Sequence, residues 1–292
     1  MSSVLGPLVV ALGGNAISPV GEVDTIENQF EHARATAARL VRLIDRGWDR
    51  LVITHGNGPQ VGNVVTRVEM AAEVAPWLPL DICVADTGGG MGYMIQQCLQ
   101  NALAHAGLER RVATLITQVE VDAGDSAFEH PAKPIGPARR LVASPRPQRV
   151  VESEVISAMV SQGIIVIAGG GGGVPVVRDG QGLKGVEAVI DKDLTAALIA
   201  HSIGATAFMI LTDVDGAYLD HGKIDAHRIE NVSVVEMRRL WGAGAFPAGS
   251  MGPKVDAACG FIESGGTVAV IAALDDLEAA IAGAAGTRIS AS

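Results

Sequence analysis

Ile164-Ile165-Val166-Ile167-Ala168 is an unbroken apolar run, and Gly169–Gly173 follows it directly. A run of β-branched residues without polar alternation is typical of a strand that is covered on both faces. Such strands belong to parallel sheets flanked by helices, and the ligands of these sheets bind beyond the carboxyl ends of the strands. The glycines that follow Ala168 are therefore expected to lie beside a ligand.

The rest of the chain alternates short apolar runs with longer amphipathic stretches, which predicts an α/β fold. Further strands are expected at Leu8–Leu12, Leu51–Thr54, Val112–Thr117, Ala207–Leu211 and Val268–Ile271. Helices are expected at Ile26–Arg46, Gly62–Glu73, Met91–Ala106, Glu152–Gln162, Leu194–Ile203 and Val255–Glu263. The predicted architecture is a three-layer α/β/α sandwich around a central, mostly parallel sheet, in a single domain over residues 1–292.

Two segments lack a helix or strand pattern. His130–Gln148 contains five prolines, which restrict the backbone to extended or turn geometry. We therefore expect this segment to be a loop or a hinge rather than a core element. Trp241–Gly249 is expected to be a mobile surface loop.

The composition excludes several classes of protein. The net charge of −10 argues against a broad nucleic-acid-binding surface. Cys83, Cys98 and Cys259 are scattered and odd in number, which fits neither a disulfide framework nor a zinc site. No apolar run reaches the roughly 18 residues of a membrane helix. We expect a cytoplasmic protein without nucleic-acid or membrane partners.

Four of the expected strands end directly in glycine-rich turns: Gly13-Gly14-Asn15, His55–Gln60, Gly169–Gly173 and Thr212–Gly216. Glycine at such a point lets backbone N–H groups approach an oxyanion, and the following helix N-terminus adds partial positive charge. One such turn is weak evidence, but four at one edge of one sheet predict a phosphate-handling site. None of them matches a P-loop or a convincing dinucleotide fingerprint.

Phosphoryl transfer to a carboxylate-like oxygen brings two anions together. Unit charges about 4 Å apart repel by roughly 4 kcal/mol at an effective dielectric of 20, so such a site needs cations. Lys192 stands between Asp191 and Asp193 just before an expected helix, Lys254 starts another helix, and Lys133 lies in the proline-rich segment. The alternative for each lysine is a solvated surface charge, and the alternative for Asp193 is a helix N-cap.

Several longer strings together resemble carbamate kinase, a branch of the amino acid kinase superfamily. They run in the family's order from about Leu8 to Leu274, and they are Val9–Ala16, Thr54–Asn63, Lys133–Pro137, Gly185–Asp193 and Gly249–Lys254. Other members of the superfamily usually carry a lysine two residues before the first glycine pair. This chain has Ala11 there, as carbamate kinases do, which separates it from the acetylglutamate, aspartate and uridylate kinases.

The resemblance implies specific roles for residues of this chain. Carbamate and the transferring phosphoryl group would be held by Gly13, Gly14, Asn15, Gly56, Asn57 and Gly58. Lys192 and Lys254 would neutralise the phosphoryl charge, Asp193 would orient both lysines, and Lys133 would be a further catalytic residue. The nucleotide would be bound by Asp213, Val214, Asp215, Tyr218, Met251 and Lys254. Magnesium would be held mainly by the phosphates, with no protein ligand assigned.

The implied reaction is ATP plus carbamate in equilibrium with ADP plus carbamoyl phosphate. In the family it usually forms ATP, in the catabolism of arginine or other carbamoyl compounds. The N-terminal half, about residues 1–150, would supply the acceptor site, and the C-terminal half, about residues 151–292, the nucleotide site. The resemblance also implies a homodimer.

One departure from the family concerns a protruding lid subdomain. In this sequence Pro137 continues through Ala138 directly into Arg139, so we expect a truncated lid at about residues 130–148 that leaves Lys133 on a shortened loop. A lid excludes water and completes a substrate pocket, so its loss predicts a more open acceptor pocket.

Two alternatives remain open at this point. The lost lid favours another acyl-phosphate-forming kinase of the same superfamily, with a larger acceptor. The other alternative is a non-catalytic sensor of ATP or carbamoyl phosphate. The charged residues Lys192, Asp193 and Lys254 count against the sensor, because binding alone does not require charge cancellation during transfer.

Overall fold

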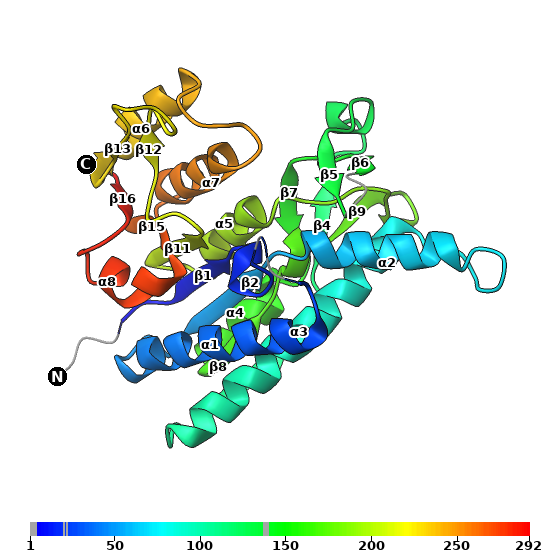
Figure 1. The fold of residues 1–292 in the computed structure, drawn as a ribbon, viewed down its shortest axis with the longest axis horizontal. Coiled ribbons are helices and arrows are strands. Elements are labelled where there is room, and N and C mark those ends of the chain that lie inside the picture. Colours follow the sequence, from blue (N-terminus) through cyan, green and yellow to red (C-terminus); the bar gives the residue numbers. More distant parts are fainter. Residues whose placement is uncertain (1–4, 20, 22, 137–139) are drawn as a thin grey trace.

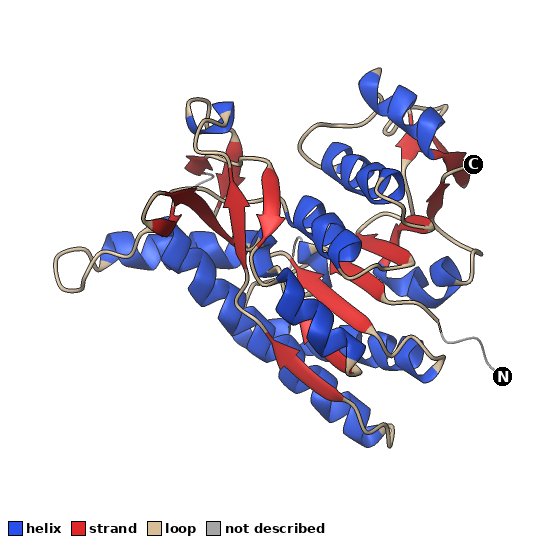
Figure 2. Ribbon diagram, turned by 180° about the vertical axis from the view of Figure 1, so that it is seen from behind, coloured by secondary structure: helices blue, strands red, loops and turns tan. Residues whose placement is uncertain are grey.

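The computed structural model describes residues 5–19, 21, 23–136 and 140–292, and within these a large and a smaller sheet are surrounded by helices (Figures 1 and 2). The large sheet has eight strands, in the order β14 (Asn231–Ser233), β16 (Thr287–Ser290), β15 (Val268–Ala273), β11 (Ala207–Thr212), β1 (Leu8–Leu12), β2 (Leu51–His55), β8 (Ile164–Ile167) and β3 (Arg111–Thr114). Neighbouring strands are parallel except β15 and β16.

Helices cover both faces of this sheet because its central strands are apolar on both sides. All five residues of β1 are fully buried. Its even-numbered residues pack on one side, where α1 (Ile26–Asp45), α3 (Leu80–His105) and α8 (Leu277–Ile281) lie. Its odd-numbered residues face the other side, with α4 (Ser153–Ser161), α5 (Lys192–Ser202) and α7 (Met251–Glu263). The predicted three-layer α/β/α sandwich is confirmed.

The smaller sheet lies beside the carboxyl ends of β2 and β8 (Figure 1). Its strands are β10 (Gly182–Gly185), β9 (Val174–Asp179), β4 (Gln118–Val121) and β7 (Pro147–Val150), in that order. Two hairpins complete the strands, β5 (Lys133–Ile135) with β6 (Arg140–Val142), and β12 (Tyr218–Leu219) with β13 (His227–Arg228). The remaining helices are α2 (Gly58–Met70) and α6 (Val234–Gly242).

The proline-rich segment His130–Gln148 was expected to be a loop or hinge outside the core, and this was wrong. It forms the β5–β6 hairpin and the start of β7. Ile135 and Val142 from this hairpin are buried in a small core with Val61 of α2. Prolines are compatible with short edge strands, where one missing N–H donor breaks no ladder. Pro137, Ala138 and Arg139 lie outside the described residues.

Two other predictions need correction. The expected strand Val112–Thr117 is too long, because β3 ends at Thr114 and β4 of the smaller sheet begins only at Gln118. The expected mobile loop Trp241–Gly249 begins inside α6, and its Phe246 is buried against the core beside α7. The described helices include none that is long and apolar enough to span a bilayer.

Candidate active site

A cavity of about 590 Å³ lies at the carboxyl ends of β1, β2, β8 and β11. All four glycine-rich turns contribute to its wall, through Gly13 and Gly14, Gly56 to Gly58, Gly171, and Thr212 to Val214 with Gly216. Because the four strands are parallel neighbours, their carboxyl ends meet at one edge of the sheet. The expected convergence of the four turns is therefore observed.

The turn after β8 needs its glycines for geometric reasons. Gly169, Gly171, Gly172 and Gly173 all have positive φ, between 63° and 94°, which side-chain-bearing residues rarely adopt. A Cβ on Gly171 would also lie 2.2 Å from the amide of Asn57. Gly171 therefore leaves room for the Asn57 side chain, which donates a hydrogen bond to Thr87 Oγ1 of α3 at 2.8 Å.

Three charged side chains form a compact cluster on the cavity wall. Lys192 Nζ donates to Asp193 Oδ1 at 2.6 Å, and Lys254 Nζ donates to Asp193 Oδ2 at 2.8 Å. Lys192 and Asp193 lie in the first turn of α5, and Lys254 lies in the first turn of α7, which packs against α5. One carboxylate thus holds two ammonium groups side by side, and both lysines face the cavity.

The pKa values of this cluster follow from its burial and its opposite charges. Burial would raise the pKa of Asp193, but the two lysines hold it well below its usual range. Burial lowers the pKa of Lys254, yet the attraction of Asp193 outweighs this effect and raises it. For Lys192 burial dominates, and the nearby Lys254 adds to it, so the pKa is lowered despite Asp193.

The alternative role of Asp193 as a helix N-cap belongs instead to its neighbour Asp191. Asp191 Oδ1 accepts a hydrogen bond from the backbone N of Asp193 at 3.0 Å and caps α5. Its other oxygen, Oδ2, accepts from Lys133 Nζ at 3.0 Å. Capping therefore leaves the Asp193 carboxylate free for the two lysines.

Lys133 reaches the cavity even though its loop is short. Lys133, Pro134 and Ile135 of β5 all lie in the cavity wall. The ion pair with Asp191 fixes the ammonium group near the start of α5. The cavity therefore contains three lysines from three separate elements.

Most of the expected nucleotide-binding residues lie in the same cavity. Asp213, Val214, Tyr218, Met251 and Lys254 contribute to its wall. Three residues that the sequence analysis missed join them, namely His221, Phe246 and Pro247. Phe246 and Pro247 follow α6 closely. The signal available in the sequence was a large aromatic residue, Phe246, within a segment that was expected to be a mobile surface loop.

One expected site residue, Asp215, does not line the cavity. Asp215 is turned to other partners, since its carboxylate accepts hydrogen bonds from Tyr218 Oη at 2.9 Å and from Arg228 Nη1 at 3.0 Å. Asp215 therefore fixes the Tyr218 ring instead of lining the cavity. Asn15 belongs to a short 3-10 turn after β1, and its side chain lies outside the described part of the structure.

The described residues include no group of three or more histidine, cysteine, aspartate or glutamate side chains arranged to hold a metal ion. Among the described residues, the carboxylates that line the cavity are Asp191, Asp193 and Asp213; Asp191 pairs with Lys133, and Asp193 pairs with Lys192 and Lys254. The donor set fits a divalent ion that is bound through nucleotide phosphates, with one carboxylate within reach of it or of its water.

Comparison with known proteins agrees with this geometry. The model of the amino acid kinase family matches residues 6–273. Carbamate kinase from Thermococcus kodakarensis is 45% identical over 309 aligned positions, covering 97% of this chain and 98% of the relative. A carbamate kinase-like protein from Escherichia coli is 42% identical, with the same coverage.

A solved structure is similar over nearly its full length. Carbamate kinase from Giardia lamblia, bound to AMP-PNP, has a TM-score of 0.95 and 35% identity, covering 99% of both chains. The glycine turns, the lysine–aspartate cluster and these full-length similarities lead to the same assignment. The chain belongs to the amino acid kinase family and, within it, to the carbamate kinases.

Proposed function

We propose that this protein catalyses reversible phosphoryl transfer between ATP and carbamate, giving ADP and carbamoyl phosphate, and that it works mainly towards ATP. The observation that carries the proposal is the Asp193 carboxylate with Lys192 and Lys254 at 2.6 and 2.8 Å, facing a cavity walled by four glycine-rich turns. Two anions must meet in this reaction, and paired ammonium groups reduce their repulsion.

Each part of the cavity has a distinct task in this proposal. Lys192 and Lys254 stabilise the charge that spreads over the equatorial phosphoryl oxygens during transfer. Asp193 orients both lysines and does not act as a base, because carbamate is already an anionic nucleophile. The turns that begin at Gly13 and Gly56 hold the acceptor and the phosphoryl group through the backbone N–H groups that follow these two residues, whose own N–H groups donate to Leu211 O and Leu12 O. Asn57 at the start of α2 assists them.

The two halves of the chain divide the substrates between them. The N-terminal half, about residues 1–150, binds the acceptor, and the C-terminal half, about residues 151–292, binds the nucleotide beside Tyr218 and Met251. Mg²⁺ bound through the nucleotide phosphates would supply neutralisation of their charge. Lys133 approaches the acceptor from β5. A cytoplasmic homodimer is proposed from the family alone.

The lid is proposed to be truncated at about residues 130–148. The Thermococcus kodakarensis alignment spans 309 positions, more than the 292 residues of this chain, so the relative carries residues that this chain lacks. The β5–β6 hairpin still covers one side of the cavity and still presents Lys133. A small acceptor such as carbamate is therefore compatible with the short form.

The direct test supplies carbamoyl phosphate with Mg-ADP and measures ATP. We expect ATP to form in step with the loss of carbamoyl phosphate, and acetyl phosphate to be used much less well. The Lys254→Ala variant is the matched negative control. Equal or better use of acetyl phosphate would contradict carbamate specificity, and ADP binding without any ATP formation would identify a sensor.

A further inference from the structure

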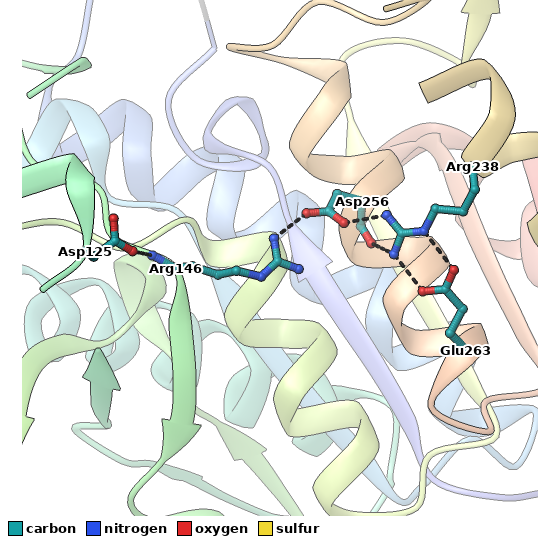
Figure 3. A network of polar contacts seen from close by, with 5 residues as sticks. All are labelled: Asp125, Arg146, Arg238, Asp256 and Glu263. Atoms are coloured by element: carbon teal, nitrogen blue, oxygen red, sulfur yellow. Dashed lines mark hydrogen bonds and ion pairs between the residues drawn. The ribbon is translucent and has the colours of Figure 1, made fainter. Parts of the chain in front are cut away.

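Asp256 of α7 is a nearly buried carboxylate that two arginines share. The residue is 6% exposed. Its Oδ1 accepts a hydrogen bond from Arg238 Nη1 at 2.6 Å, and its Oδ2 accepts from Arg146 Nη1 at 2.7 Å (Figure 3). Burial would raise the pKa of Asp256, but the two guanidinium groups hold it below its ordinary value. Asp256 is therefore a charged junction with one arginine on each oxygen.

The two arginines come from different parts of the fold. Arg238 belongs to α6 and also binds Glu263 at the end of α7, with Nε and Nη2 at 2.8 and 2.7 Å from its two oxygens. This bidentate pair ties α6 along α7, within the C-terminal half. Asp256 thus has one partner from its own side of the molecule.

Arg146 reaches the same carboxylate from the other side. It lies just before β7 of the smaller sheet, and its backbone N donates to Asp125 Oδ2 at 2.9 Å. Figure 3 shows its side chain extending from this green segment to Asp256 on the orange helix α7. Arg146 is therefore fixed to the smaller sheet by its backbone and to α7 by its guanidinium group.

Both ends of this link lead directly to lysines of the cavity. Asp256 is two residues beyond Lys254 in the same helix, so a shift of α7 also shifts Lys254. Arg146 follows the β5–β6 hairpin that carries Lys133, with β6 ending at Val142. Neither Arg146 nor Asp256 lines the cavity, so their hydrogen bond joins the two segments from outside it.

We propose that Arg146 is a positioning residue, whose ion pair with Asp256 holds α7 against the segment carrying Lys133 and so sets where the Lys254 ammonium group lies in the cavity. The proposal rests on the proposed function, because the readout is phosphoryl transfer. The Arg146 side chain is 64% exposed, so its contribution to global stability is small. Its effect should therefore appear in catalysis more than in folding.

The chain provides a matched control for the test. Arg149 lies on β7 three residues further on, is similarly exposed at 54%, and pairs with Glu120 inside the smaller sheet. Arg149→Ala therefore removes the same charge from the same segment without touching α7. Arg146→Lys keeps the charge and most of the reach.

Steady-state kinetics with carbamoyl phosphate and Mg-ADP test whether Arg146 positions Lys254. Arg146→Ala should lower kcat about ten-fold with both KM values changed less than about three-fold, since a displacement of about 1 Å can cost up to a hundred-fold. Arg146→Lys should recover most of the rate, and Arg149→Ala should keep it. In a Lys254→Ala background, Arg146→Ala should cause no further loss.

Each other outcome overturns the proposal in a recognisable way. An Arg146→Ala enzyme as active as Arg149→Ala removes the positioning role while the proposed function stands. A fall in melting temperature that matches the loss of activity and is not recovered by lysine indicates a purely structural contact. Absence of ATP formation in the unmodified protein overturns the proposed function itself, and this inference with it.

Discussion

Substituting alanine for Gly62 tests whether the β5–β6 hairpin must dock on α2 for activity. A Cβ on Gly62 would lie 1.9 Å from Gly136 Cα and 2.3 Å from Gly136 N, where ordinary contacts begin at 3.4 Å. The hairpin backbone would have to retreat by about 1.5 Å, the difference between 1.9 and 3.4 Å. Gly136 adopts φ +66° at the end of β5, three residues after Lys133.

This displacement should reach catalysis through Lys133. Misplacing a catalytic group by about 1 Å can cost about a hundred-fold, so we expect Gly62→Ala to lower kcat by ten- to a hundred-fold. Overpacking costs about 1–3 kcal/mol, and alanine returns about 1 kcal/mol of helix propensity in α2, so the protein should stay folded. Steady-state assays with carbamoyl phosphate and Mg-ADP measure kcat, and urea unfolding measures the stability.

Gly90 provides the control for this experiment. It also lies inside a helix, α3, but a Cβ there would meet nothing within 4 Å. Gly90→Ala should raise stability by up to about 1 kcal/mol and leave kcat unchanged. A folded Gly62→Ala enzyme with the kcat of the unmodified protein would refute the reasoning. The reasoning would also be refuted if, in the double variant, the loss of kcat caused by Gly62→Ala added in full to the loss caused by Lys133→Ala.

Further expected outcomes concern the charge cluster and one buried histidine. Lys254→Ala should cut kcat by at least about 100-fold, the range for removing one transition-state donor, and unchanged turnover in the ATP assay would exclude the residue. Asp193→Asn should lower kcat with little change in ADP affinity measured by calorimetry, and a pure affinity defect would contradict its orienting role. Burial lowers the pKa of His55 from 6.5 to about 4, so the unfolded chain binds more protons between those pH values. Stability should therefore fall by up to about 3 kcal/mol as the pH drops through this window. In urea titrations, His55→Gln should reduce the slope of the unfolding free energy against pH, and His105→Gln, at an exposed position, should not. The same slope in both variants would contradict this assignment.

The central strands and their glycine turns could be predicted because their signals are local. The strand around Val166 is apolar on both faces, and positive-φ glycines follow it immediately. Lys192 and Asp193 were recognisable for a similar reason, since an entire string of motif residues surrounds them. At these positions, residues adjacent in the sequence determine both the buried strand and the turn that follows it.

Contacts between distant segments could not be predicted in this way. The pairing of Lys133 with Asp191 joins residues 58 apart, and that of Arg146 with Asp256 joins residues 110 apart. The first half of α3 was missed because Gly88 to Gly90 weaken the helical pattern. Gly88 is nevertheless helical, because α3 packs against the turn at Gly170 at this point. This tertiary contact overrides the low helix propensity of glycine.

The central claim is that Lys192 and Lys254 meet the transferring phosphoryl group while Asp193 holds them together. A crystal structure with Mg²⁺ and a non-hydrolysable ATP analogue tests this most directly. We predict both ammonium nitrogens within about 3 Å of oxygens of the terminal phosphate, in the hydrogen-bonding range. A terminal phosphate bound elsewhere in the cavity, with both lysines still paired only to Asp193, would contradict the account.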